Sequence, residues 1–268
     1  MEQPITVKAA QIGVFILAKN EEANIARNLV ALAPAGWPVH VLDSGSTDNT
    51  ENIVAEFPFA VFQKYHYTNH CNAYNEITAE LGSAYRFVII LDADMIISEA
   101  LRLELNQLIA APASSWNVVE AEIEMCVDGV PLKYASLCPP KPFLFAQGKV
   151  YFVSTGHGEK IGKGFQIART RSKLRHDDRK PYSSYLQSQY RYSNNLVERY
   201  LLGEVTSRDS LRVKWPLLIF AVPFVSYFLK MGFLDGRAGL IYALDRLVAE
   251  AVMYRQALAS RLRKDIDS

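Results

Sequence analysis

The apolar run Phe87–Leu91 is followed at once by Asp92-Ala93-Asp94. A run of this kind predicts a strand that is buried on both faces, as the inner strands of a parallel sheet are. Its carboxyl end, where open α/β folds place their ligands, then carries two carboxylates one residue apart. Carboxylate oxygens bind hard divalent cations, which commonly also hold phosphate groups. The run therefore predicts a buried parallel strand that ends at an acidic binding site.

Strand and helix patterns alternate through about the first hundred residues. In order, they predict strand Ile12–Leu17, a helix capped by Asn20, strand Val39–Leu42, a helix capped by Ser46 or Asp48, strand Phe59–Phe62, helix Asn72–Leu81, strand Phe87–Leu91 and a helix capped by Ser98. Such alternation requires right-handed crossovers and a mostly parallel sheet. The predicted fold class is therefore α/β, with helices on both sides of the sheet.

The pattern changes after about residue 115. Val118–Val127 alternates polar and apolar residues and predicts one half-exposed strand, antiparallel or at an edge. Pro139, Pro140 and Pro142 predict a loop, and the Gly-rich, basic stretch 147–182 predicts irregular structure. We therefore expect an α/β half over residues 1–115, a second part of the same domain over 116–205, and a C-terminal extension over 206–268.

Composition narrows the classes of protein. Half of the 268 residues are apolar, which is ample for a core, and the net charge of +1 argues against nucleic acid as an obligatory partner. Three widely spaced cysteines, without a CxxC pair, fit a reduced cytosolic compartment and not a disulfide framework or structural zinc site. The first residues lack the basic start and apolar stretch of a signal peptide.

Trp215–Leu229 is strongly apolar, but it is short and two prolines interrupt it. A spanning helix needs roughly 20 apolar residues, so we expect an interfacial or re-entrant segment instead. Arg212, Lys214 and Lys230 flank it, as basic residues flank membrane-surface helices. Gly236–Arg263 then predicts an amphipathic helix. The alternative is a helical hairpin that covers the core or forms a dimer interface.

A second acidic motif, Asp43-Ser44-Gly45-Ser46-Thr47-Asp48, lies at another predicted strand end and opens a helix. Gly45 permits a tight turn before the free N–H groups of the helix. Asp43 can accept hydrogen bonds from a base or a ribose. Helix capping alone explains Ser46 and Asp48.

Three segments together resemble the inverting family 2 glycosyltransferases of the GT-A fold. They are Phe15–Glu22 (FILAKNEE), Asp43–Thr50 and Leu91–Asp94 (LDAD), and they agree with the family in order and spacing. The resemblance covers roughly residues 10 to 110. It implies a nucleotide-sugar donor, with a UDP-sugar favoured, a divalent metal, Mg or Mn, and a sugar acceptor.

The resemblance also implies roles for single residues. Leu17, Ala18 and Glu21 would lie against the nucleoside, Asp43 would read the base, Asp92 would contact ribose or metal, and Asp94 would bind the metal that bridges the diphosphate. Asn75 resembles an Asn that many members carry before the acidic motif. The usual Gly- and Arg-containing sequence around it is replaced by His70–Tyr74, which leaves the diphosphate contacts open.

The catalytic base is expected in the second half of the chain, where Asp177 and Asp178 stand next to each other. Adjacent carboxylates on an extended segment point in different directions, so one Asp is expected to face the site. A subset of bacterial members resembles this stretch, with a Gln-X-Arg-aromatic element after the acidic pair; here Arg191 belongs to that element. By this analogy Asp178 is the first choice for the base and Asp177 the second.

Three further residues remain open. Glu159 is a fallback base. His176, which precedes the acidic pair, is a candidate metal ligand, and His157 is a weaker one.

The sequence thus predicts a metal-dependent inverting glycosyltransferase bound peripherally to the cytoplasmic face of the inner membrane. Its expected acceptor is a lipid-linked saccharide in bacterial surface glycan synthesis. One alternative is a nucleotidyltransferase of related fold, although the sequence after the first strand lacks the Gly-rich, basic loop that such enzymes use. The other is a non-catalytic membrane-surface binding module.

Overall fold

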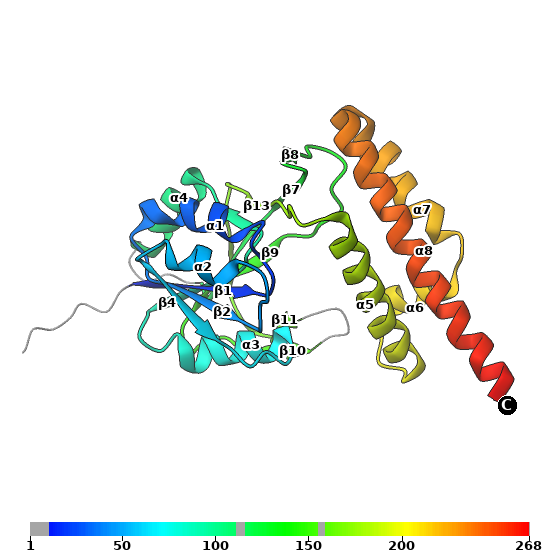
Figure 1. Ribbon diagram of the computed structural model, residues 1–268, viewed down its shortest axis with the longest axis horizontal. Helices are drawn as coiled ribbons and strands as arrows, with labels where there is room; N and C mark the ends of the chain where they lie inside the picture. Colours follow the sequence, from blue (N-terminus) through cyan, green and yellow to red (C-terminus); the bar gives the residue numbers. More distant parts are fainter. Residues whose placement is uncertain (1–10, 111–115, 155–158, 268) are drawn as a thin grey trace, which may run out of the picture. The chain divides into compact units, whose positions relative to one another are not determined.

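The structure, a computed structural model, describes residues 11–110, 116–154 and 159–267 (Figure 1). The chain forms two compact units, and they interleave along the sequence. The first comprises Met1–Ile123, Pro139–Val153 and Lys160–His176, and the second comprises Glu124–Cys138, Ser154–Glu159 and Asp177–Ser268. The division into three successive parts that the sequence predicted stays a prediction.

A seven-stranded mixed sheet forms the centre of the first unit. Its spatial order is β12 (Ile167–Arg169), β6 (Val118–Ala121), β9 (Lys141–Ala146), β4 (Phe87–Asp92), β1 (Ile12–Ala18), β2 (Val39–Asp43) and β3 (Ala60–Lys64). Strands β4, β1, β2 and β3 run parallel, and β9 runs antiparallel to β4 and to β6. The predicted α/β class and its parallel strands are confirmed.

Helices cover both faces of this sheet (Figure 1). On one face, Val14 and Ile16 of β1 belong to a core with residues of α1 (Ile25–Leu32), α2 (Thr50–Ala55) and α4 (Glu99–Ala110). On the other, Phe15 and Leu17 belong to a core with α3 (His70–Glu76) and the π-helical turn η2 (Ile77–Leu81). Successive side chains of a strand point to opposite faces, so β1 supplies both cores and is buried along its whole length.

Short segments complete the first unit. The short helix η1 (Ala33–Ala35) follows α1, β5 (Met95–Ile97) pairs antiparallel with β13 (Leu174–His176), and β10 (Phe152–Ser154) pairs with β11 (Glu159–Ile161). The predicted helix cap at Ser98 is confirmed, because its hydroxyl accepts a hydrogen bond from the Leu101 N–H at 3.2 Å.

Two sequence expectations need correction here. Val118–Val127 is not one half-exposed strand: it breaks at Glu122 into β6 and β7 (Ile123–Val127). Strand β6 is mostly buried because β9 and β12 pair with it on either side. Pro142 lies inside β9 and not in a loop. Proline is tolerated there because the pairing between β6 and β9 is irregular at this point.

Helices dominate the second unit. They are α5 (Tyr182–Leu201), α6 (Ser207–Lys214), α7 (Leu218–Phe224), the π-helical turn η3 (Val225–Leu229), the short helix η4 (Gly232–Asp235) and the long α8 (Gly236–Asp267). Helix α8 packs against α5, α6 and α7. The predicted C-terminal amphipathic helix is confirmed as an element, because α8 covers Gly236–Arg263.

A hairpin precedes these helices in the second unit. Strands β7 and β8 (Val130–Pro131) are joined by Asp128 and Gly129, which have φ angles of 46° and 81°. Two central residues with positive φ make the turn that fits the twist of paired strands. The positive φ at Gly129 favours glycine, and an added β-carbon would also meet the Arg179 guanidinium, which would have to move.

The stretch after the hairpin is fixed to η4 by one carboxylate. Asp235 accepts hydrogen bonds from the backbone N–H groups of Lys133, Tyr134 and Ala135 at 2.8–3.0 Å. The Ser226 hydroxyl donates to the Ala135 carbonyl at 2.8 Å. Residues 133–135 are thereby held to the segment that connects α7 with α8.

Candidate functional site

Strand register brings the acidic motifs to one edge of the sheet. Ala18 pairs with Asp43, and Leu17 pairs with Asp92. The carboxyl end of β1 therefore lies between the two motifs, with one aspartate on each side. Leu17, Ala18, Asp43 and Asp92 thus meet at the carboxyl edge of the parallel strands, where ligands of open α/β sheets bind.

The loops after β1 and β2 interlock. Asn20 adopts a left-handed conformation, with φ of 53°, and its side-chain oxygen accepts from the Thr47 N–H at 2.8 Å. The Glu21 N–H donates to the Thr50 hydroxyl at 2.9 Å, and the Glu22 N–H donates to Asp48 at 3.0 Å. The predicted cap at Asn20 is wrong: helix α1 begins only at Ile25, because this loop hydrogen-bonds to its neighbour instead.

Asp43 organises its own loop. Its buried carboxylate accepts from the N–H groups of Gly45 and Ser46, both at 2.9 Å, and from the Ser46 hydroxyl. Ser46 therefore serves this loop and not a helix cap. Asp48 accepts from the N–H of Thr50, the first residue of α2, at 3.1 Å. The predicted contact of Asp43 with a base stays a prediction, as do the nucleoside contacts of Leu17, Ala18 and Glu21.

Asp92 is paired with a residue that the sequence did not point to. The Lys141 ammonium at the start of β9 lies 2.6 Å from Asp92 Oδ2. Burial alone would raise the pKa of Asp92, but the charge of Lys141 outweighs it and lowers the pKa to about 2. Nothing in the sequence marked Lys141 as a site residue, because the prolines on either side of it predicted a loop. Lys141 reaches the site because β9 pairs with β4.

Asp94 is paired with His176. The His176 Nε2 atom lies 3.1 Å from Asp94 Oδ2, because β13 pairs with β5 and sets His176 opposite Met95. Burial lowers the pKa of His176, but the Asp94 carboxylate outweighs it, so the pKa is raised. The other oxygen, Asp94 Oδ1, is buried and has no hydrogen-bond partner among the described residues.

Asn28 fixes the backbone that carries this acidic motif. It is a buried residue of α1, and its Nδ2 donates to the Met95 carbonyl at 2.5 Å. The same group lies 3.4 Å from the carbonyls of Asp92 and Ala93. A polar residue on the apolar face of a predicted helix was the available signal, because a buried amide needs a partner.

The pair Asp94 and His176 fits a divalent cation as part of its ligand set. Carboxylate oxygen and imidazole nitrogen both bind Mn²⁺, and carboxylate oxygen binds Mg²⁺. A buried carboxylate oxygen without a partner is costly unless something else satisfies it. Across the described residues, no group of three or more His, Cys, Asp or Glu side chains is arranged to hold a metal.

Asn75 has a structural contact in this unit. Its side-chain oxygen accepts from the Phe152 N–H at 2.7 Å, and its Nδ2 donates to the Phe152 carbonyl at 3.0 Å. Both ends of the amide thus hold β10 against α3. The predicted contact of Asn75 with the donor stays a prediction.

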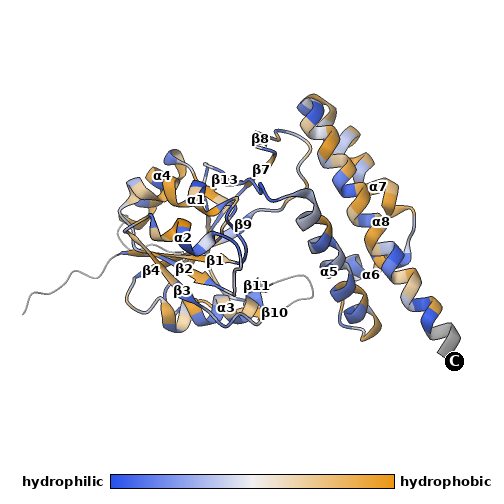
Figure 2. Ribbon diagram, in the orientation of Figure 1, coloured by the Kyte–Doolittle hydropathy of each residue, from blue (hydrophilic) through white to orange (hydrophobic). Residues whose placement is uncertain are grey.

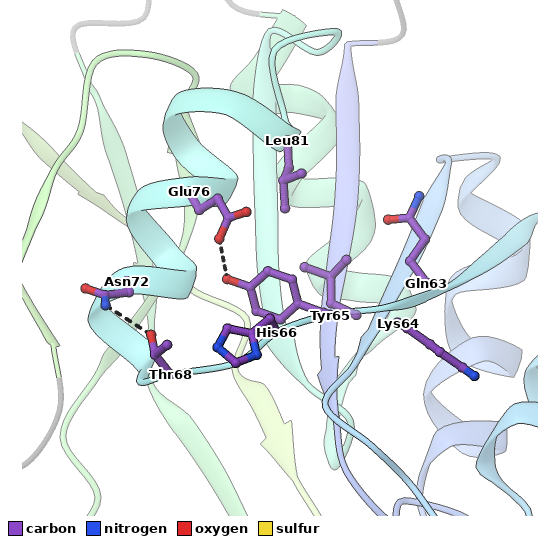
Figure 3. A pocket seen from close by; sticks show the side chains of 9 residues that line it. Gln63, Lys64, Tyr65, His66, Thr68, Asn72, Glu76 and Leu81 are labelled. Atoms are coloured by element: carbon purple, nitrogen blue, oxygen red, sulfur yellow. Dashed lines mark hydrogen bonds between the residues drawn. The ribbon is translucent and has the colours of Figure 1, made fainter.

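A pocket of about 600 Å³ opens between the end of β3 and α3 (Figure 3). Its lining residues are Leu42, Gln63, Lys64, Tyr65, His66, Thr68, Asn72, Glu76 and Leu81. In Figure 3 the Tyr65 hydroxyl points to Glu76, to which it donates at 2.6 Å. None of the residues predicted for the donor or the metal lines this pocket. The predicted site is a sheet edge formed by strand ends and loops.

The predicted base residues belong to the second unit, where the two aspartates differ. Asp177 is buried, and its Oδ1 accepts from the Gly129 N–H at 3.0 Å and from Arg179 Nε at 2.8 Å. Asp178 is exposed and accepts from the Lys180 N–H at 3.0 Å. The pair therefore splits into one structural carboxylate and one that faces solvent.

The other predicted residues of this region are less informative. Arg191 lies exposed on α5, with its guanidinium 5.5 Å from the ring centre of Tyr192. Its proposed role stays a prediction. His157 lies outside the described residues, and the side chain of Glu159 does as well.

Comparison with known proteins finds one family model that matches the first part of the chain. Residues 13–114 match the model of glycosyl transferase family 2. This segment contains β1 to α4 and both acidic motifs. No curated protein matches the chain.

Two solved structures show a general likeness. Residues 1–349 of S. aureus TarS are 16% identical at a TM-score of 0.46, over 95% of this chain and 92% of that one. Glucosyl-3-phosphoglycerate synthase from Mycobacterium tuberculosis, in complex with Mn²⁺, UDP and glucosyl-3-phosphoglycerate, is 17% identical at a TM-score of 0.43, over 71% and 80%. Likenesses of this strength assign no substrate to this chain.

Proposed function

We propose that this chain, whose residues 13–114 match the model of glycosyl transferase family 2, transfers a sugar, with inversion, from a nucleoside diphosphate sugar to an acceptor. A UDP-sugar is the favoured donor. The proposed acceptor is a lipid-linked saccharide in bacterial surface glycan synthesis. The proposed cofactor is Mg²⁺ or Mn²⁺.

One observation supports the donor and metal part of this proposal. Asp94 presents a buried oxygen without a described partner, and its other oxygen lies 3.1 Å from His176. A divalent cation bound by Asp94 and His176 would supply positive charge for the departing diphosphate. Lys141 lies next to this site through its pair with Asp92 and adds a fixed positive charge for the same group.

The remaining steps follow from the chain's own residues. Leu17, Ala18, Glu21 and Asp43 border the nucleoside at the edge formed by β1 and β2. An acceptor hydroxyl attacks the anomeric carbon from the face opposite to the diphosphate, and the bond from that carbon to the diphosphate oxygen breaks. Asp178 accepts the hydroxyl proton. An exposed carboxylate suits this role better than Asp177, which is already bound to Gly129 and Arg179.

A nucleotidyltransferase is disfavoured by the loop after β1. Such enzymes need a Gly-rich, basic loop there to hold a triphosphate. Here the backbone N–H groups of Asn20, Glu21 and Glu22 donate instead to Ser46, Thr50 and Asp48. Those N–H groups therefore already have partners within the protein.

A donor screen followed by a transfer assay tests the proposal. Nucleotide sugars with and without Mn²⁺ should raise the melting temperature, because a ligand that prefers the folded state stabilises it. Asp94→Ala should reduce donor turnover on the order of 100-fold or more, since it removes a metal ligand. The matched control is Glu99→Ala, an exposed carboxylate on α4, which should keep full turnover. Full turnover in Asp94→Ala would refute the proposed metal site.

A further inference from the structure

The second unit exposes an unusual set of large apolar side chains. Phe220, Phe224 and Phe228 are 67%, 52% and 54% exposed. Their spacing of four residues sets them on one face of α7 and η3. Helix α8 begins with a similar exposed stripe, Leu240, Ile241 and Leu244. Figure 2 shows the apolar colouring of α7 and of the start of α8.

The connecting segment carries the same character. Between α6 and α8, further large apolar side chains are exposed, namely Trp215, Leu217, Leu229, Met231, Phe233 and Leu234. We call residues 215–244 the apolar corner. Single exposed apolar residues are common on proteins, but a continuous group of this kind marks an interaction surface.

Charge around the apolar corner is one-sided. From Ser210 to Leu234 the sequence contains no Asp or Glu. Lys214, Lys230 and Arg237 are exposed at its borders. Asp235 follows, but its carboxylate accepts three backbone N–H groups. The border of the corner is therefore cationic, which complements an anionic surface.

The corner cannot cross a bilayer by one straight helix. In the described chain, no single helix is long and apolar enough, whereas Leu218–Leu229 with Gly232–Arg263 passes that test only as a pair bent by 70°. The first arm is about 18 Å long at 1.5 Å per residue, against a hydrocarbon core of about 30 Å. The second arm carries Asp245, Arg246 and Glu250 on its middle turns, so only its start suits lipid.

The bend itself is built into the backbone. Met231 has φ of 59°, and Gly232 packs so closely that an added β-carbon would lie 2.7 Å from the Ser226 carbonyl oxygen. The two arms therefore meet at a tight turn. A tight turn keeps both apolar stripes of the corner on the surface of one structured element.

We propose that the apolar corner docks on an anionic lipid bilayer, with α7, η3, η4 and the first turns of α8 lying in the interface between headgroups and acyl chains. Aromatic and aliphatic side chains enter the acyl boundary. Lys214, Lys230 and Arg237 contact anionic headgroups. This goes beyond the proposed sugar transfer, because the docking needs neither donor nor metal.

Vesicle binding by the full chain, without nucleotide sugar or metal, tests this proposal. The protein should sediment with vesicles of phosphatidylglycerol and phosphatidylethanolamine. It should bind phosphatidylcholine vesicles on the order of 10- to 100-fold more weakly, since three cations lose their anionic partners. Asp94→Ala should bind like the wild type, which separates this result from failure of the proposed enzymatic function.

Trp215 gives a local readout. It is 56% exposed, whereas Trp37 and Trp116 are 9% and 8% exposed. Vesicles should therefore shift the tryptophan emission to shorter wavelength, and Trp215→Phe should remove that shift while the protein still sediments. An unchanged spectrum in the wild type would refute the docking.

A matched pair of double variants separates the corner from general surface hydrophobicity. Phe220→Asp with Phe228→Asp should reduce vesicle binding on the order of 10-fold or more. Val30→Asp with Leu103→Asp, at 62% and 49% exposure in the first unit, should leave it unchanged. Equal binding by both variants would overturn the proposal. So would a dimer that the corner variant dissociates, found by light scattering together with no vesicle binding.

Discussion

Strand β1 and helix α7 are seven-residue segments of nearly the same composition, IGVFILA and LIFAVPF, but they differ in burial. Every residue of β1 is buried, and no residue of α7 is. Strand β1 lies between β4 and β2, with helices over both faces of the sheet. Helix α7 packs along α8 and leaves its other side exposed. Hydropathy alone therefore does not set burial; the number of neighbouring elements does.

The difference extends to the polar residues. In the first unit, strands with apolar interiors end in Asp43 and Asp92, so the functional groups gather at one sheet edge. In the second unit the buried clusters are small, such as Leu196, Val213 and Met253, and the large apolar side chains face outward. Apolar surface stabilises the fold in the first unit and remains available for a partner in the second.

The largest effect on activity is expected at the adjacent aspartates, of which Asp177 is buried and Asp178 is exposed. Asp178→Asn should lower the rate of transfer by about 10²- to 10⁴-fold, because it removes the proposed base. Donor binding, measured by thermal shift, should not change. Asp178→Asn with normal transfer would move the base elsewhere.

Asp177→Asn should act mainly on folding. It removes a buried, charge-assisted hydrogen bond to Arg179, whose own side chain is 40% exposed, so we expect a cost of about 1–3 kcal/mol in the free energy of unfolding. Urea unfolding measures this loss. If Asp178→Asn instead destabilised the protein as much, exposure would not be what distinguishes the two carboxylates.

A second test compares the two apolar segments directly. Ile16→Ala in β1 should lower the free energy of unfolding by about 2–5 kcal/mol, because it opens a cavity in a closed core. Phe220→Ala in α7 should change it by less than about 0.5 kcal/mol, because that ring is already exposed. Denaturant unfolding followed by circular dichroism measures both changes. Equal losses of unfolding free energy in the two variants would contradict the difference in burial between β1 and α7.

The smallest effect concerns the ion pairs of the first unit. Lys141→Met should cost about 1–3 kcal/mol near pH 6, since a partly buried, charge-assisted hydrogen bond is lost. The exposed control Arg169→Met, which breaks a pair with Glu120, should cost less than about 1 kcal/mol.

The stability that the pair Asp92–Lys141 contributes should depend on pH in a definite direction. Because the pKa of Asp92 is lowered in the folded chain, its ionised form stabilises the protein above the ordinary carboxyl range. That contribution is lost as the pH falls toward about 2. The difference between the wild type and Lys141→Met should therefore narrow from pH 5 to pH 3. A difference that grows as the pH falls would contradict the assigned pair.

The sequence predicted the parallel strands well because their apolar runs report burial directly. It predicted the edge position of Asp43, Asp92 and Asp94 from the same runs. The prediction failed where contacts between residues distant in the sequence determine the local structure. Asn20 accepts a hydrogen bond from Thr47 and does not cap a helix. Lys141 lies in a proline-rich stretch and reaches Asp92 through strand pairing. Short strands such as β12 and β13 carry too few residues for a periodic pattern.

The clamp at Asp235 has a mechanical consequence. It ties residues 133–135 to the bend between the two arms, and the β7–β8 turn a few residues earlier holds Asp177 through Gly129. Tension applied at the bend by a surface would thus reach the acidic pair through a handful of backbone bonds. Membrane anchoring would then be coupled to the position of Asp177, the direct neighbour of the proposed base.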